Sequence, residues 1–343
     1  MAILALSHLP TPFVVASHNG LQSRELRLPY RLQEGQSRIF HRLSSGLSME
    51  AIVQKGDDSV GGASHHSPIV FVHGSFHAAW CWAEHWLPYF SHAGYDCYAV
   101  SLLGQGESDL PNGKFAGTLE THTCDIADFI QEQVKNPPIL IGHSFGGLII
   151  QSYIANMTLQ SSLHRFSHSG RRHSPPMLAG AVLACSVPPS GNGGLVWRYL
   201  MSKPIAAIKV TLSLAAKAFA NSLPLCKETF FSPTMGDLLV QRYQDLMKES
   251  SRVPLFNLRE LNASLPVQSV PRNSTDILVL GAKDDFIVDL EGLNETAKFY
   301  GIDPVCVEGV AHDIMLDVEW EKGAQVILSW IKSSNFLFTS SDQ

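Results

Sequence analysis

The sequence predicts an α/β protein with a mostly parallel central sheet, helices on both faces of that sheet, and an inserted helical cap. Short runs of Val, Ile and Leu alternate with helix-like segments, and each run is nearly continuous in apolar residues, as in strands buried on both faces. A long segment interrupts this alternation before the last two strands and carries helical patterns of its own. The expected organisation is a leader over 1–36, a core from 37–185 and 272–334, a cap over 186–271 and a tail over 335–343.

The first half of the core begins with a predicted β-hairpin. Residues 37–43 and 47–54 flank the turn residues Ser44-Ser45-Gly46, a pattern that favours two antiparallel strands. Buried strands and helices should then alternate, because apolar runs of strand length are separated by segments with helical spacing. The predicted strands are 69–72, 97–102, 139–141 and 179–185, and the predicted helices are 78–91, 119–134 and 148–154.

The second half contains the cap and the last two strands. Residues 205–220 are aliphatic with two lysines about two turns apart, and 237–249 has a second helical pattern, so both are predicted helices. Strands are predicted at 276–281 and 304–308. Helices inserted before these strands would cover the carboxyl ends of the sheet as a lid.

Composition excludes several classes of function. The 343 residues carry a net charge of −6, which gives no reason to expect a nucleic-acid partner. No run of 18 or more apolar residues is free of charge, so no membrane span is predicted. The six cysteines form no C-x-x-C pair, which favours a reducing compartment. We expect no metal and no nucleotide cofactor, because neither metal-ligand spacing nor a G-x-G-x-x-G motif after a strand is present.

The N-terminus resembles a targeting segment. Residues 1–24 contain no Asp or Glu and include several Ser and Thr residues, as in plastid transit peptides. A secretory signal fits less well, because Pro10 and Pro12 interrupt any helix and no basic segment precedes the apolar run. The expected location is the chloroplast, with a cytoplasmic protein that has a disordered N-terminus as the alternative.

A predicted nucleophile elbow lies at Ser144. The strand at 139–141 ends in Gly142-His143-Ser144-Phe145-Gly146, and an apolar helical segment follows. A sharp turn between strand and helix brings backbone segments too close together for a Cβ atom, and Gly142 and Gly146 lack one. In this context we expect Ser144 to be a catalytic nucleophile rather than part of a structural turn.

Two later strand ends offer the partners that a serine nucleophile needs. A general base must take the proton from Ser144, and a carboxylate must orient that base. Asp284 and Asp285 follow the strand at 276–281, and His312 follows the strand at 304–308. The chain order Ser, Asp, His is the order expected for an elbow serine.

Taken together, these motifs resemble the α/β-hydrolase superfamily from about residue 37 to residue 332. The matching pieces are His73-Gly74, Gly104-x-Gly106-x-Ser108, Gly142–Gly146, Gly281–Val288 and Gly309-x-Ala311-His312. The segment 73–82 is also similar to the plant methylesterase and hydroxynitrile-lyase group, but Gly104-Gln105-Gly106-Glu107-Ser108 departs from that group. The resemblance therefore implies the α/β-hydrolase fold with a helical lid, and it does not supply a substrate.

The resemblance also implies roles for individual residues. The register before Phe286-Ile287-Val288 favours Asp285 over Asp284 as the triad acid. The oxyanion hole is expected from the backbone N–H groups of Phe145 and Ser75. The other histidines near these motifs are expected to be structural or surface residues: His73, His77, His122 and His143. Asp289 and Asp313 are expected at the surface or at helix starts.

The expected function is a serine hydrolase that cleaves a small-molecule ester or thioester, with an apolar acyl or lipid-like group favoured by the apolar lid. A serine at the elbow argues against the related dehalogenase and epoxide hydrolase branches, which use aspartate there. The alternatives are a lyase of the hydroxynitrile-lyase type, and a hormone receptor or binding protein on the same fold. The sequence does not fix the oligomeric state.

Overall fold

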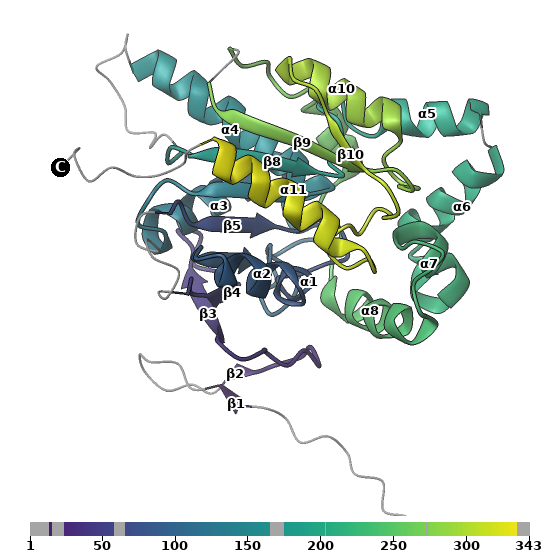
Figure 1. Ribbon diagram of the computed structural model, residues 1–343, viewed down its shortest axis with the longest axis horizontal. Helices are drawn as coiled ribbons and strands as arrows, with labels where there is room; N and C mark the ends of the chain where they lie inside the picture. Colours follow the sequence, from purple (N-terminus) through teal and green to yellow (C-terminus); the bar gives the residue numbers. More distant parts are fainter. Residues whose placement is uncertain are drawn as a thin grey trace, which may run out of the picture.

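A sheet of eight strands forms the centre of the molecule. The computed structural model describes residues 14–15, 24–57, 66–164, 175–202, 204–271 and 274–334. The strand order is β10-β9-β8-β7-β5-β6-β4-β3 (Figure 1). The six strands β10, β9, β8, β7, β5 and β6, in this order across the sheet, pair in parallel with their neighbours. Strand β4 pairs antiparallel with both β3 and β6. The predicted α/β class with a mostly parallel sheet is confirmed.

The predicted strands are all present, with ends that differ by a few residues. The strands β5 to β8 are buried along their whole length, which explains their nearly continuous apolar sequences. The bounds are β3 Gln36–Arg42, β4 Ser48–Gln54, β5 Ile69–Val72, β6 Cys97–Val100, β7 Ile139–His143, β8 Gly180–Ala184, β9 Asp276–Ala282 and β10 Val305–Val307. A separate two-stranded sheet pairs β1 (Val14–Val15) with β2 (Arg24–Glu25).

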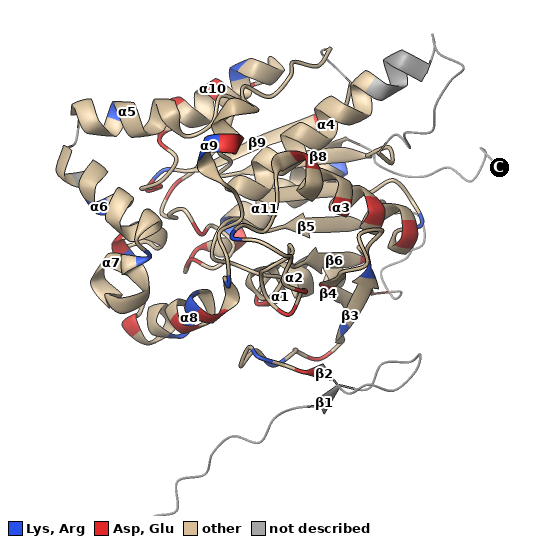
Figure 2. Cartoon of the chain, turned by 180° about the vertical axis from the view of Figure 1, so that it is seen from behind, with Lys and Arg blue, Asp and Glu red and all other residues tan. Residues whose placement is uncertain are grey.

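Helices cover both faces of the sheet. One face carries α1 (Trp80–Ala83), α2 (Trp86–His92) and α11 (Trp320–Ser333), and the other carries α3 (Leu119–Gln133), α4 (Phe145–His164) and α10 (Leu290–Tyr300). Alternate residues of each strand enter separate hydrophobic clusters, so that Phe71 packs on the first face and Val70 on the second. Charged residues gather on outer helices such as α3 and α8 and are nearly absent from the central strands (Figure 2).

The single helix predicted over 78–91 is wrong, because the structure divides it into α1 and α2. The break lies at His85, whose φ of −133° and ψ of −48° depart from helical values. Pro88 accounts for it, since a proline clashes with the carbonyl group four residues earlier and cannot donate a hydrogen bond to it. A continuous helix would place the Glu84 carbonyl in that position.

The segment between β8 and β9 contains α5 (Gly193–Ser202), α6 (Pro204–Ala215), η2 (Ala218–Asn221), α7 (Leu223–Phe230), α8 (Asp237–Ser250) and α9 (Leu258–Ala263). Helices α5 to α8 lie beyond the edge at which the parallel strands end (Figure 1). The predicted helix over 205–220 is shorter than expected, because Lys217 adopts a left-handed φ of 51° that interrupts it.

The predicted leader and tail lie mostly outside the described residues. Within the described part, Leu28 and Tyr30 are buried, and the backbone N–H groups of Arg27 and Leu28 donate to Glu107 Oε1 at 2.8 and 2.6 Å. The tail over 335–343 and residues 165–174 are not described. Across the described segments, no helix has the length and apolar character needed to cross a membrane. The six cysteines are free.

Candidate active site

Ser144 occupies a strained turn between β7 and α4. Its φ is 54°, a conformation that residues with a side chain rarely adopt. A Cβ atom on Gly146 would lie 2.2 Å from the Val72 carbonyl oxygen, and one on Gly142 would lie 2.6 Å from the Gly146 carbonyl oxygen. The turn therefore requires glycine at both positions, as the sequence predicted. The N–H of Ser144 donates to the Ala184 carbonyl at 3.1 Å, which ties the turn to the end of β8.

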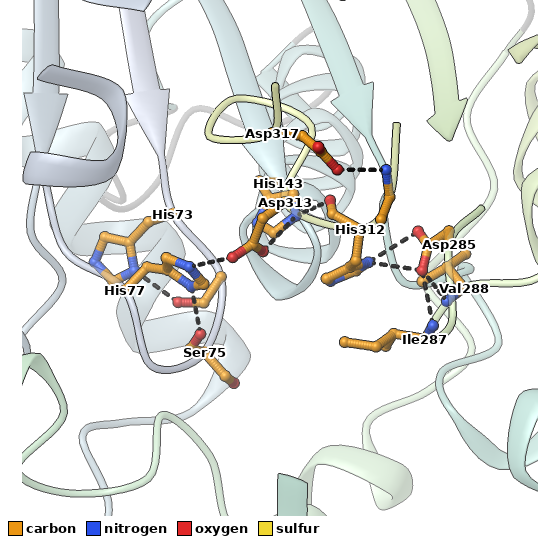
Figure 3. A network of polar contacts seen from close by, with 12 residues as sticks. His73, Ser75, His77, His143, Asp285, Ile287, Val288, His312, Asp313 and Asp317 are labelled. Carbon is orange, nitrogen blue, oxygen red and sulfur yellow. Dashed lines mark hydrogen bonds and ion pairs between the residues drawn. The ribbon is translucent and has the colours of Figure 1, made fainter. Parts of the chain in front are cut away.

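His312 and Asp285 meet at the ends of the last two strands. The His312 Nδ1 atom lies 2.8 Å from Asp285 Oδ2 and 3.0 Å from Oδ1 (Figure 3). Asp285 Oδ1 also accepts the N–H groups of Ile287 and Val288 at 2.7 and 2.8 Å, which fixes the carboxylate. Asp284 is exposed, so of the two aspartates the structure brings Asp285 to the histidine.

The charge of Asp285 controls the ionisation of His312. Burial by itself lowers the pKa of His312, but the charge and hydrogen bond of Asp285, with a smaller contribution from the charge of Asp313, outweigh it. The pKa of His312 is therefore raised above its ordinary value. An Nδ1–H that donates to Asp285 leaves Nε2 as the atom that can accept a proton.

Cys185 supports the same carboxylate from the end of β8. Its Sγ lies within 4.8 Å of a carboxylate oxygen of Asp285, and the side chain is fully buried at a residue with a φ of 44°. Burial, followed by the charge of Asp285, raises the pKa of Cys185 well above that of a free thiol, so the sulfur keeps its proton beside the carboxylate. The sequence suggested only an ordinary core cysteine at this position.

The loop after β5 lies against Ser144. A Cβ atom on Gly74 would come within 2.8 Å of Ser144 Cβ, so the backbone that leads into Ser75 passes directly beside the elbow. Phe145, the other expected oxyanion donor, is the first residue of α4. The two residues expected to form an oxyanion hole, Ser75 and Phe145, are thus both close to Ser144 in the structure.

His73, in the same loop, acts as a structural residue. Its Nδ1–H donates to the Gly74 carbonyl at 2.7 Å, and its Nε2 accepts the N–H of Leu102 at 3.0 Å. Burial lowers the pKa of His73 to about 3, so the ring stays neutral. Both nitrogens are occupied, which agrees with the structural role expected for this residue.

Asp313 is a correction to the sequence analysis. We expected a surface or helix-start residue, but Asp313 is completely buried and its Oδ2 lies 2.9 Å from His77 Nε2 (Figure 3). Asp289 does begin a helix, because its side chain accepts the N–H of Gly292 at the start of α10. The sequence signal for Asp313 was available: it directly follows His312 and precedes the apolar run Ile314-Met315-Leu316.

Folding also gathers residues that are far apart in the sequence. His77, His143 and Asp313 have ligand atoms within 4.8 Å of one another, and so do Cys185, Asp285 and His312. Sequence spacing alone indicated no such group. The second group consists of the proposed acid, base and supporting thiol, whereas the first lies beneath the elbow.

Comparisons with known proteins place this site in context. The profile of the Alpha/beta hydrolase family matches residues 69–325. Part of the chain is 33% identical over 81 residues to a carbendazim hydrolyzing esterase of Nocardioides sp., covering 24% of this chain and 33% of that protein. A non-heme chloroperoxidase of Streptomyces lividans is 31% identical over 122 residues, covering 36% of this chain and 37% of that protein. The chain therefore spans about a third of the length of these two relatives.

A longer match is to a pFDCC methylesterase of Arabidopsis thaliana, 24% identical over 224 residues, which covers 60% of this chain and 80% of that protein. Among solved structures, an esterase of Exiguobacterium antarcticum superposes with a TM-score of 0.61 at 18% identity, covering 85% of this chain and 98% of that chain. The esterase RhEst1 of Rhodococcus sp. gives a TM-score of 0.58 at 22% identity, with coverages of 87% and 100%. At these identities the structural matches show the fold alone.

Proposed function

Because the chain belongs to the alpha/beta hydrolase family, we propose that it is a serine hydrolase that cleaves a carboxylic ester or a thioester through Ser144, His312 and Asp285. The observation that carries the proposal is the 2.8 Å contact between His312 and Asp285, together with a serine held at a φ of 54° on the elbow. An esterase and a methylesterase among the relatives support the same reaction class.

In the proposed mechanism, His312 Nε2 takes the proton from Ser144 Oγ while that oxygen attacks the substrate carbonyl. Asp285 keeps the imidazole in the required tautomer and stabilises its charged form. The N–H groups of Phe145 and Ser75 stabilise the developing oxyanion, and each such donor contributes about 3 kcal/mol to the transition state. His312 then protonates the leaving alcohol or thiol, and water releases the acyl group by the reverse sequence.

We infer an apolar acyl group from the contacts of the oxyanion loops. Phe76, next to Ser75, has its ring 4.8 Å from that of Phe219, and Phe145 has its ring 5.3 Å from that of Phe256. Both partners belong to the segment inserted between β8 and β9. Apolar side chains from the insertion therefore border both proposed oxyanion donors, where an acyl chain would enter.

A fluorophosphonate probe tests the proposed nucleophile. The intact protein should be labelled, the adduct should map to Ser144 by mass spectrometry, and Ser144→Ala should abolish it, because the probe forms a bond with an activated serine. Ser202→Ala, an exposed serine on α5, serves as the matched control and should label as the parent does. An unlabelled parent would favour a binding protein on this fold over a hydrolase, and a labelled protein that turns over no ester would favour the lyase alternative.

A further inference from the structure

A buried polar network lies next to His312 and Asp285 of the proposed active site (Figure 3). It joins His77, from the loop after β5, to Asp313, the residue after the proposed base. His77 is 1% exposed and Asp313 is 0% exposed, so solvent does not satisfy their polar atoms. Buried polar groups of this kind are costly unless they are paired, so the hydrogen bonds that His77 and Asp313 do form hold the segments that carry them.

The hydrogen bonds of His77 define a continuous connection. Its Nδ1 lies 2.8 Å from the Ser75 carbonyl oxygen, which can only accept, so Nδ1 carries a hydrogen. Its Nε2 lies 2.9 Å from Asp313 Oδ2, so a hydrogen bond joins the ring to this carboxyl group. The path therefore runs from the Ser75 carbonyl group through the His77 ring to Asp313.

The residue between Ser75 and His77 explains why this loop needs an anchor. Phe76 has a φ of 69°, a left-handed conformation that residues with a side chain avoid. Such a backbone persists only where the surrounding structure holds it. His77 binds the carbonyl group of Ser75 across Phe76, and therefore holds the peptide unit on the N-terminal side of the strained residue.

The other end of the path is fixed to the loop that carries His312. The N–H of Asp313 donates to the Phe230 carbonyl at 3.0 Å. His143, on the elbow strand, donates from Nε2 to the His312 carbonyl at 2.9 Å. Burial first, and then the charges of His312 and His77, lower the pKa of His143 well below its ordinary value. The 3.8 Å approach of His143 to Asp313 is therefore not an ion pair.

We propose that His77 and Asp313 are positioning residues, which hold the oxyanion loop at Ser75 in a fixed relation to the loop of the base His312. This inference rests on the proposed serine hydrolase function. Neither side chain needs to touch the substrate. Their contribution is to keep the Ser75 N–H where the oxyanion forms, since a donor displaced by about 1 Å can cost on the order of 10²-fold in rate.

Hydrogen exchange tests the positioning role without requiring turnover. In Asp313→Ala the amides of residues 74–77 should exchange at least about ten-fold faster than in the parent, because the His77 anchor is lost. The matched control is Asp128→Ala. Asp128 forms a second His–Asp pair, 2.9 Å from His41 Nε2, away from the elbow. Unchanged exchange at 74–77 in Asp313→Ala, or equal acceleration there in Asp128→Ala, would overturn the proposal.

Kinetics with p-nitrophenyl acetate supply the second measurement. Asp313→Ala should lower kcat by about 10²-fold and leave KM within about two-fold, because the oxyanion donor acts in the transition state. Asp313→Asn should recover kcat to within about three-fold of the parent, since its amide N–H can donate to His77 Nε2, and Asp313 Oδ1 has no hydrogen bond in the described structure that the change would break. An Asn variant as slow as the Ala variant, or a loss confined to KM, would contradict positioning.

The two proposals fail in different ways. If the parent protein hydrolyses no ester, but the amides of residues 74–77 exchange faster in Asp313→Ala, the hydrolase function is refuted and the positioning role of His77 and Asp313 stands.

A metal ion is the alternative explanation for the group of His77, His143 and Asp313, because their ligand atoms lie within 4.8 Å of one another. Elemental analysis of the purified protein should find no bound metal at one equivalent, and a full equivalent that Asp313→Ala removes would overturn the proposal.

Discussion

At the scale of single residues, the protonation of His312 connects the structure to activity. The imidazole is buried, and its surroundings contribute Asp285, Asp313, His143 and Cys185. His143 is neutral and Cys185 keeps its proton, so the two carboxylates are the groups whose charge acts on His312. They stabilise the imidazolium, which raises the pKa of His312, and they also strengthen it as a base.

The sign of the pH dependence follows from this arrangement. His312 must be neutral to accept the proton of Ser144, so kcat/KM should fall as the pH drops through the pKa of His312. Because that pKa is raised, the acid limb should lie above the ordinary histidine value of about 6.5. Asp285→Asn should move the limb to lower pH and lower kcat by about 10⁴-fold, since both the charge and the orienting acceptor are lost.

The measurement is a pH–rate profile with a p-nitrophenyl ester for the parent, Asp285→Asn and Asp284→Asn. Asp284 is the neighbouring exposed aspartate, so its variant controls for a change of charge at the surface and should follow the parent profile. An Asp284 variant with the larger loss would contradict the assignment of Asp285 as the triad acid.

At the scale of elements, the inserted helices are joined to the active site by aromatic contacts. Phe76 packs against Phe219 of η2 and Phe230 of α7, with ring centroids 4.8 and 6.5 Å apart. The Nζ atom of Lys217 lies 5.7 Å from the centre of the Phe76 ring. The Phe76 side chain is only partly buried, whereas Phe219 and Phe230 are buried, so the Phe76 ring is the accessible apolar group among these three. These contacts make the η2 segment the element expected to select the acyl chain.

Hydrolysis of p-nitrophenyl esters of increasing chain length tests this expectation. Each methylene that enters an apolar pocket contributes about 0.8 kcal/mol, so kcat/KM should rise by about four-fold per added methylene until the pocket is full. Phe219→Ala should change that dependence. Trp197→Ala, on α5 of the same insertion and 65% exposed, should leave it unchanged. A flat profile in the parent would contradict the apolar acyl pocket.

Sequence reasoning succeeded where a local pattern determines the structure. The buried strands and the two glycines of the tight turn at Ser144 each follow from a few adjacent residues, and the structure contains both features. The catalytic role of Ser144 stays a prediction. It failed where the outcome depends on distant partners. Asp313 was misjudged because its burial depends on His77, 236 residues away in the chain. The break at His85 could have been found, since Pro88 is visible in the sequence, but the tryptophans around it suggested one continuous helix.

At the scale of the whole molecule, an N-terminal arm packs on the core, although the predicted core begins only at residue 37. The arm, residues 24–36, crosses to the loop that carries Gly106 and Glu107. Arg27 donates from Nη2 to the Gly106 carbonyl at 2.9 Å, in addition to the two backbone N–H groups that Glu107 accepts. Glu107 is 3% exposed, so removal of the arm would leave a buried carboxylate without these partners. The leader boundary near residue 36 stays a prediction, and these contacts favour a processing site before Arg27.

Two truncations test the arm. Deletion of 1–36 removes the buried Leu28 and Tyr30 side chains, each worth about 1.5–3 kcal/mol, and should lower the free energy of unfolding by at least about 3 kcal/mol. Deletion of 1–23 keeps the arm and should change it by less than about 1 kcal/mol. Urea unfolding of both variants and the full chain gives these values. Mass spectrometry of the native protein from its source should then find an N-terminus before Arg27. Equal stabilities of the two truncations, or a native N-terminus after Tyr30, would show that the arm is dispensable and that the leader extends through it.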